Sequence, residues 1–122
     1  MKNRVWLGAV VAALFLAGVA LYAAAEKATV TGEVIDSACY AKNGSKGPDH
    51  AACAQRCAKN GVPLALLTDD SKVVMIASSK EGESGNALLV DDVAKKVTVE
   101  GTWSEKEGKK VLVVDKVLAP GK

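Results

Sequence analysis

The sequence predicts a mainly β domain, a small five-stranded barrel with one short helix between its first two strands and a second between its third and fourth. Two observations predict this fold class. Runs of alternating residues rich in β-branched side chains recur after residue 26 and are separated by turn residues. Two segments between these runs have helical spacing instead. With 122 residues, the chain has room for a single domain.

Residues 1–25 have the organisation of an export signal. Lys2 and Arg4 make its start positive, residues 5–22 are apolar throughout, and three alanines before Glu26 offer a cleavage site. We therefore expect a signal peptide at 1–25 and one domain at 26–122, located outside the cytoplasm, either periplasmic or secreted. The apolar run is also close to the shortest membrane span. An uncleaved anchor is the alternative, and it would be the domain's only contact with a membrane.

The expected elements of the domain follow one another in a simple order. Residues 29–36 alternate and form the first strand. An insertion at 37–61 contains a helix that Asp49 is expected to cap and that Gly61 ends in a left-handed conformation. The remaining elements are strands at 64–68 and 72–77, a short helix at 87–95, and strands at 96–103 and 110–117.

This order of elements is that of an OB-type barrel, in which the loop between the first two strands commonly shapes a binding site. Gly32 and Gly101 lie inside two predicted strands and fit the bends of a small closed barrel. The fold class predicted is therefore a five-stranded OB-like barrel whose first connection is the insertion at 37–61.

The charge of the domain argues against nucleic acid as a partner. Removal of residues 1–25 takes away two of the sixteen basic residues and none of the fourteen acidic ones, which leaves a formal charge of zero. A neutral domain lacks the basic surface that nucleic-acid binding requires. Trp103, the only tryptophan in residues 26–122, is expected at the core or at the barrel end and not as a stacking platform.

All three cysteines and the only histidine fall in the insertion. At about 100° per residue, His50, Cys53 and Cys57 share an arc of roughly 60° on the predicted helix. Cys39 lies on the preceding loop, whose glycines allow it to fold back over that face. Three thiols and an imidazole suit tetrahedral zinc and also copper. We therefore predict a metal site formed by Cys39, His50, Cys53 and Cys57.

Other uses of these cysteines remain open. Thiols outside the cytoplasm tend to be oxidised or metal-bound, so Cys53 and Cys57 could cycle between dithiol and disulfide near a helix N-terminus that favours thiolate. Cys39 could instead be bridged to one helix cysteine, or the cysteines could be inert core residues. A c-type haem site is not expected, because Cys57 is followed by Ala58 and the C-x-x-C-H motif is absent.

Three sequence motifs carry a family resemblance. T-G-E-V-I-D-S-A-C-Y, H-A-A-C-A-Q-R-C-A-K-N-G-V-P and K-K-V-T-V-E-G-T resemble a family of small exported bacterial proteins built on a domain of unknown function. The resemblance covers nearly the whole of residues 26–122. It implies an exported OB-like domain and a shared role for Cys39, Cys53 and Cys57, but it implies no activity.

The function expected from the sequence is that of a non-enzymatic, exported metal-binding module. Its expected partner is a zinc or copper ion, with another envelope protein as a further candidate. A catalytic serine, histidine and aspartate set around His50 is weakly indicated, because serines are abundant in the chain. Thiol redox work by Cys53 and Cys57 is the alternative function.

Overall fold

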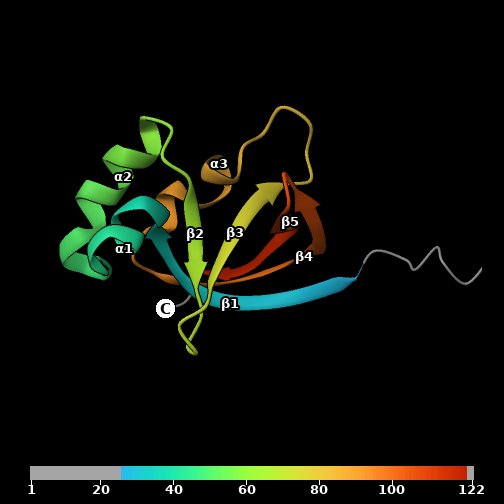
Figure 1. Ribbon diagram of the computed structural model, residues 1–122, viewed down its shortest axis with the longest axis horizontal. Coiled ribbons are helices and arrows are strands. Elements are labelled where there is room, and N and C mark those ends of the chain that lie inside the picture. Colours follow the sequence, from blue (N-terminus) through green and yellow to red (C-terminus); the bar gives the residue numbers. More distant parts are fainter. Residues whose placement is uncertain (1–25, 121–122) are drawn as a thin grey trace, which may run out of the picture.

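The computed structural model describes residues 26–120, and within them five strands form a closed ring (Figure 1). The strands are β1 (Lys27–Asp36), β2 (Leu64–Leu67), β3 (Val73–Ser78), β4 (Lys96–Lys106) and β5 (Lys109–Pro120). The helices are α1 (Ser37–Asn43), α2 (Ala51–Lys59) and α3 (Gly85–Leu89), with 3₁₀ turns η1 (Pro48–His50) and η2 (Val90–Asp92). The mainly β fold class is confirmed. The signal or anchor expected at 1–25 lies outside the described residues.

The ring has the strand order β1-β2-β3-β5-β4 and closes because β4 also pairs with β1. β1 is long enough to serve two neighbours. Its first part pairs with β4 and its last residues, from Glu33 to Asp36, pair with β2. Every pairing is antiparallel except the one between β3 and β5. Only Glu33 pairs with both neighbours, and β2 holds the end of β1 where the chain leaves the sheet.

The core fills the inside of the ring and continues under two helices. The alternation of β4 places Val97 and Val99 inside, where they are fully buried. α2 adds Ala54 and Ala58 to the same cluster, and α3 adds Leu89. Because alanines leave little bulk on that face, α2 packs close to the sheet at the end where β1 stops. Figure 1 shows α1 and α2 together at this end of the ring.

Two glycines inside strands allow backbones to approach closely. A Cβ on Gly101 would lie 2.3 Å from the Val113 carbonyl oxygen, and one on Gly32 would lie 2.8 Å from that of Leu67. The register between β4 and β5 also shifts at Gly101, which is typical of a bulge. At both positions the absence of a side chain is what permits the neighbouring strand to lie this close.

The structure corrects three details of the predicted elements. Cys39 lies on α1, a helix that the sequence pattern did not predict, and not on a loop. Asp49 caps nothing: α2 follows directly from η1 and has no side-chain cap, because Pro48 already sets the first turn. The short helix begins at Gly85 and not at residue 87, since the Ser84 hydroxyl accepts a hydrogen bond from the Ala87 N–H.

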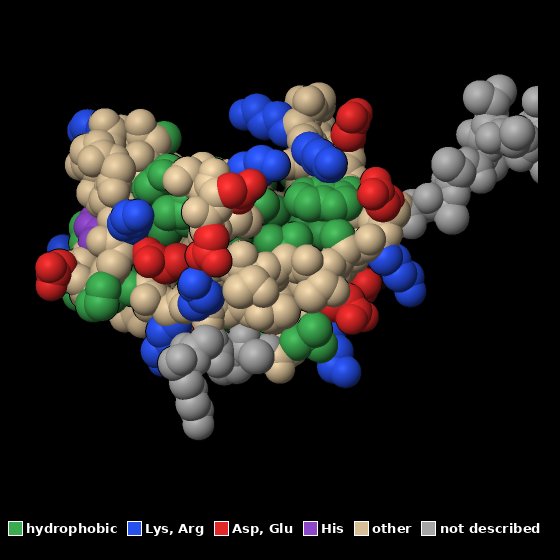
Figure 2. All heavy atoms as spheres, turned by 90° about the horizontal axis from the view of Figure 1, so that it is seen from below, with side chains coloured by type: hydrophobic (Ala, Val, Ile, Leu, Met, Phe, Trp, Pro, Cys, Tyr) green, Lys and Arg blue, Asp and Glu red, His purple; other side chains and the backbone are tan. Residues whose placement is uncertain are grey.

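No helix within residues 26–120 combines the length and the apolar character needed to span a membrane. On the face shown in Figure 2, apolar side chains gather in the middle, and basic and acidic side chains lie around them.

Candidate metal centre

The site begins at Asp36, where β1 passes into α1. The side chain of Asp36 is only 1% exposed. Its Oδ1 accepts hydrogen bonds from the backbone N–H groups of Ala38 (2.9 Å) and Cys39 (3.0 Å), so Asp36 is the N-cap of α1. The sequence D-S-A-C therefore turns the chain immediately after the strand and brings Cys39 back toward the carboxylate that caps its own helix.

Hydrogen bonds to β1 and β2 hold the rest of the insertion in place. Glu33 Oε2 accepts from the Gly47 N–H at 2.9 Å, and the His50 N–H donates to the Gly47 carbonyl at 3.1 Å. The Ser37 hydroxyl and N–H both donate to the Pro63 carbonyl, at 2.6 and 3.1 Å. These contacts tie the start of α1 to the start of β2 and set His50 beside the end of β1.

Asp36, Cys39 and His50 form a compact group of potential ligands. One ligand atom from each lies within 4.8 Å of the other two. In tetrahedral zinc coordination, bonds of about 2.0–2.3 Å put ligand atoms roughly 3.5 Å apart. Small side-chain movements are enough to bring the three atoms to that separation. The group is a candidate metal site whose ligands come from the end of β1, from α1 and from η1.

Two atoms of this group have no hydrogen-bond partner. Among the described residues, Asp36 Oδ2 and His50 Nε2 are the only buried side-chain nitrogen or oxygen atoms in that condition. A buried polar atom without a partner costs about 1–3 kcal/mol. Both atoms are good metal ligands and both belong to the same group of three residues. An ion bound there would satisfy them together.

The Cys57 thiol extends the group. The neighbouring Asp36 carboxylate raises the pKa of Cys57 to about 11, with burial as the second cause. For Cys39, burial is the main cause of a raised pKa and the Asp36 carboxylate is the second. Burial alone would raise the pKa of Asp36. Hydrogen bonds from the Cys39 N–H, the two thiols and the Ala38 N–H outweigh burial, so the pKa of Asp36 is lowered. The weakly donating thiols do not complete a well-aligned bond to Oδ2.

These shifts describe a carboxylate that is ionised beside two thiols that are protonated at neutral pH. A cation reverses this preference, because coordination favours thiolate and releases the protons. Without an ion the group therefore carries the negative charge of Asp36, and the thiols add further negative charge only when a cation enters with it.

The four predicted ligands have different positions in the structure. Cys39 and His50 lie in the compact group, and Cys57 lies against Asp36 and Cys39. Cys53 is exposed and contacts Cys57 one helical turn away. The three cysteines are not joined by disulfides. Asp36 was not predicted as a ligand, although its position three residues before Cys39 is the sequence signal of a helix cap.

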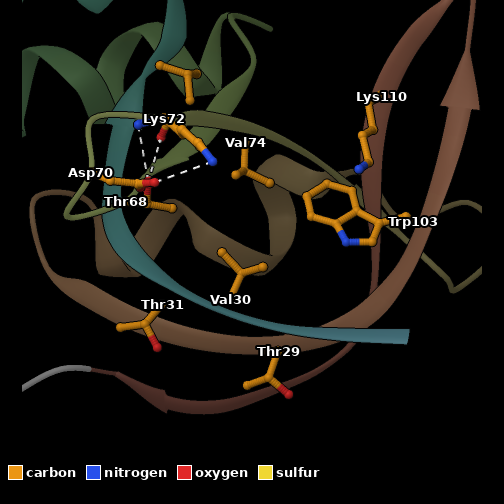
Figure 3. A pocket seen from close by; sticks show the side chains of 10 residues that line it. Thr29, Val30, Thr31, Thr68, Asp70, Lys72, Val74, Trp103 and Lys110 are labelled. Atoms are coloured by element: carbon orange, nitrogen blue, oxygen red, sulfur yellow. Dashed lines mark hydrogen bonds and ion pairs between the residues drawn. The ribbon is translucent and has the colours of Figure 1, made fainter. Parts of the chain in front are cut away.

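A separate hollow of about 610 Å³ lies on another part of the ring (Figure 3). Its charged groups already have partners: Asp70 accepts from the Thr68 hydroxyl and pairs with Lys72 at 3.4 Å, and the Lys110 ammonium lies 4.5 Å from the centre of the Trp103 ring. No described buried polar atom without a partner lies there. Among the described residues, the buried side-chain atoms without a hydrogen-bond partner belong to Asp36 and His50.

Comparisons with protein-family models, with curated proteins and with solved structures give no match. The class of the protein therefore follows from its own fold and site: a mainly β domain with an Asp, Cys and His group that could hold a metal ion. The family resemblance of the three sequence motifs stays a prediction.

Proposed function

We propose that this protein is a non-enzymatic metal-binding module that holds a zinc or copper ion with Asp36, Cys39, His50 and Cys57. The observation that carries the proposal is the coincidence of two facts. The buried side-chain atoms that lack a partner, Asp36 Oδ2 and His50 Nε2, lie in the one group of described residues whose ligand atoms converge within 4.8 Å.

The donor set favours zinc over copper. Thiolates and imidazole suit both Zn²⁺ and Cu⁺, but a carboxylate is a harder ligand that suits Zn²⁺ better. Two thiolates, one imidazole and one carboxylate complete a tetrahedral shell. A zinc site with four protein ligands has no open position for a reacting water, which supports a binding role and not catalysis.

We also propose that the domain is OB-like and exported. Two observations support an OB-like assignment. One is the strand order with its parallel β3–β5 pair, and the other is the position of the site in the connection after β1. The charged start and apolar run of residues 1–25 support export. The mass of the protein recovered from a bacterial envelope fraction tests both cleavage after Ala25 and location.

The metal proposal is tested on the chain that lacks residues 1–25, purified without chelator or reductant. Elemental analysis should find about one zinc or copper per chain, and the intact mass should show three unbridged thiols. Cobalt substitution should give the charge-transfer absorption of thiolate ligands. Cys39→Ser should lose the ion, while the matched change Ser45→Ala in the same insertion should keep it. A metal-free protein that refuses added Zn²⁺ would overturn the proposal.

The thiol redox alternative has less support from the site. A redox cysteine reacts as thiolate, and a low pKa is what makes it reactive. The carboxylate of Asp36 acts in the opposite direction on Cys57. A protein mass lighter by two hydrogens, without bound metal, would favour this alternative over the metal site.

A further inference from the structure

We infer that Cys53 is the exchange ligand of this centre, the exposed thiol through which the ion passes between the buried ligands and an acidic, thiol-bearing protein partner. The inference rests on the proposed function, because Cys53 has this role only if its neighbours hold an ion.

The first support is the position of Cys53 in a continuous series of donors. Cys53 and Cys57 are four residues apart on α2, so they share one helix face, and the Cys53 thiol is near enough to raise the pKa of Cys57. Cys57 in turn contacts the Asp36 carboxylate, which caps the helix of Cys39. Exposure falls along this series, from exposed Cys53 through partly buried Cys57 to Asp36, which is 1% exposed. Cys53 is therefore the member that meets solvent first.

The second support is that Cys53 has no packing role. α2 buries Ala54 and Ala58 in the core, whereas Cys53 is exposed. An exposed free thiol adds little to stability and is prone to unwanted oxidation. Its position beside the fourth ligand, and not elsewhere on the surface, gives it a use in ligand exchange.

The exchange step is a substitution of one thiolate for another. Cys53 loses its proton to solvent as its sulfur bonds to the ion, and the bond between the ion and Cys57 breaks as that sulfur takes up a proton. A thiolate of the partner then replaces Cys53 in the same way. Further donors of the partner or water molecules then replace Cys39, which takes up a proton as its bond to the ion breaks, and finally His50 and Asp36. No electrons are transferred, and the ion keeps its charge and a full set of ligands throughout.

The charge around Cys53 indicates the kind of partner. Residues 37–59 contain four basic residues and one acidic residue, while the rest of 26–122 contains ten basic and thirteen acidic residues. Residues 37–59 thus carry a formal charge of +3, and the rest of 26–122 carries a formal charge of −3. Arg56 and Lys59 are exposed on α2, which has no acidic residue. A protein with an acidic surface around its thiols complements this region.

The test measures transfer of Co²⁺ from the loaded domain to three acceptors: a synthetic peptide with two cysteines among acidic residues, the same peptide with basic residues, and EDTA. Cys53→Ser is compared with Ala52→Ser, which alters the adjacent exposed position. We expect Cys53→Ser to keep the ion and its absorption spectrum but to deliver it to the acidic peptide about tenfold or more slowly. Ala52→Ser should transfer at the wild-type rate, and the acidic peptide should outpace the basic one at low salt.

The possible results separate this inference from the proposed function. A wild-type domain that binds no ion overturns both. If Cys53→Ser retains the ion and transfers it as fast as wild type, the exchange role is wrong and the metal site stands. If Cys53→Ser loses the ion while its circular dichroism is unchanged, Cys53 is one of the holding ligands and the exchange role is again wrong. A faster basic peptide overturns the acidic partner.

Discussion

Asp36 performs two tasks that belong to different oxygens of one carboxylate. Oδ1 caps α1 through the N–H groups of Ala38 and Cys39, and Oδ2 is left buried without a partner at the candidate metal site. The capping bonds fix the orientation of the whole group. The same bonds that start the helix therefore leave the second oxygen free to act as a ligand beside Cys39 and His50.

The change Asp36→Asn separates these two tasks. Asparagine caps helices as well as aspartate does, so the free energy of unfolding without metal should fall by less than about 1 kcal/mol. The loss of the carboxylate should weaken zinc binding by more than about tenfold. Chemical denaturation and competition with a chromophoric chelator measure the two effects. Asp36→Ala is the comparison, since it should lose the cap and the ligand together; equal zinc affinity in Asp36→Asn would remove Asp36 from the site.

At this scale the sequence pointed to cysteine and histidine ligands but not to a carboxylate. Cys39, His50, Cys53 and Cys57 were predicted because cysteine and histidine are rare here and lie in one insertion, and the structure brings Cys39 and His50 together with Asp36. Asp36 is one of fourteen acidic residues, and only its burial distinguishes it. The sequence also could not predict that Cys53 is exposed. Helical spacing shows that residues share a face, but it does not show which edge of that face is in contact with solvent.

Asn86, the second residue of α3, links three elements around the site. Its amide group donates to the carbonyls of Ala58 (3.1 Å) and Val62 (2.8 Å) at the end of α2, and its oxygen accepts from the Leu64 N–H (2.8 Å) at the start of β2. One side chain thus holds the end of α2 against the ring. The position of Cys57 depends on this anchor.

We expect Asn86→Ala to lower the free energy of unfolding by about 2 kcal/mol or more, because three backbone groups lose their partner. Asn86→Asp should also destabilise, since a carboxylate accepts from Leu64 but cannot donate to the two carbonyls. Both variants should weaken zinc binding without touching a ligand. Urea denaturation and zinc competition measure these changes, with Asn43→Ala as a control outside the anchor; unchanged stability in both variants would show that Asn86 is dispensable.

Gly101 tests the close approach of β4 to β5. A methyl group there would overlap the Val113 carbonyl, and the strands cannot separate without breaking the ring. Gly101→Ala should therefore cost about 2 kcal/mol or more, measured by thermal or urea denaturation. Ser104→Ala, on an exposed position of the same strand, should change stability little. A fully stable Gly101→Ala would mean that the two strands can move apart freely.

The predictability of the elements depended on their length and pattern. The first strand and the last two were predicted because alternation repeats over many residues, and the second and third because two apolar runs flank a turn. α1 was not predicted because it is seven residues long and buries none of them fully. Its stability comes from its ends, where Asp36 caps the first turn and Gly44 adopts a left-handed conformation with φ of 73°. End effects of this kind leave little periodic signal in a sequence.

For the whole molecule, the core and the candidate site are separate. The buried cluster within the ring contains none of the proposed ligands. We therefore expect the domain to stay folded without metal, unlike zinc fingers, which unfold when metal is removed. The sequence could not show this separation, because which strands enclose the core depends on pairings between residues far apart in the chain, such as Ile76 with Leu112.

Metal removal should accordingly lower the melting temperature without abolishing the transition. Saturating zinc at a hundredfold above the dissociation constant adds about 2.7 kcal/mol. Scanning calorimetry with zinc and with EDTA measures the difference, and Cys39→Ser should show no response to zinc. Unfolding on EDTA addition at room temperature would contradict the separation of core and site.

The last strand is what shuts the ring. β5 bridges β3 and β4, and its final residue, Pro120, pairs with Val97. While the chain is being synthesised, β1, β2, β3 and β4 can form at most an open sheet, because the strand that joins β3 to β4 has not yet been made. The ring can close only once β5 is present. Closure is therefore the last step in the assembly of these five strands.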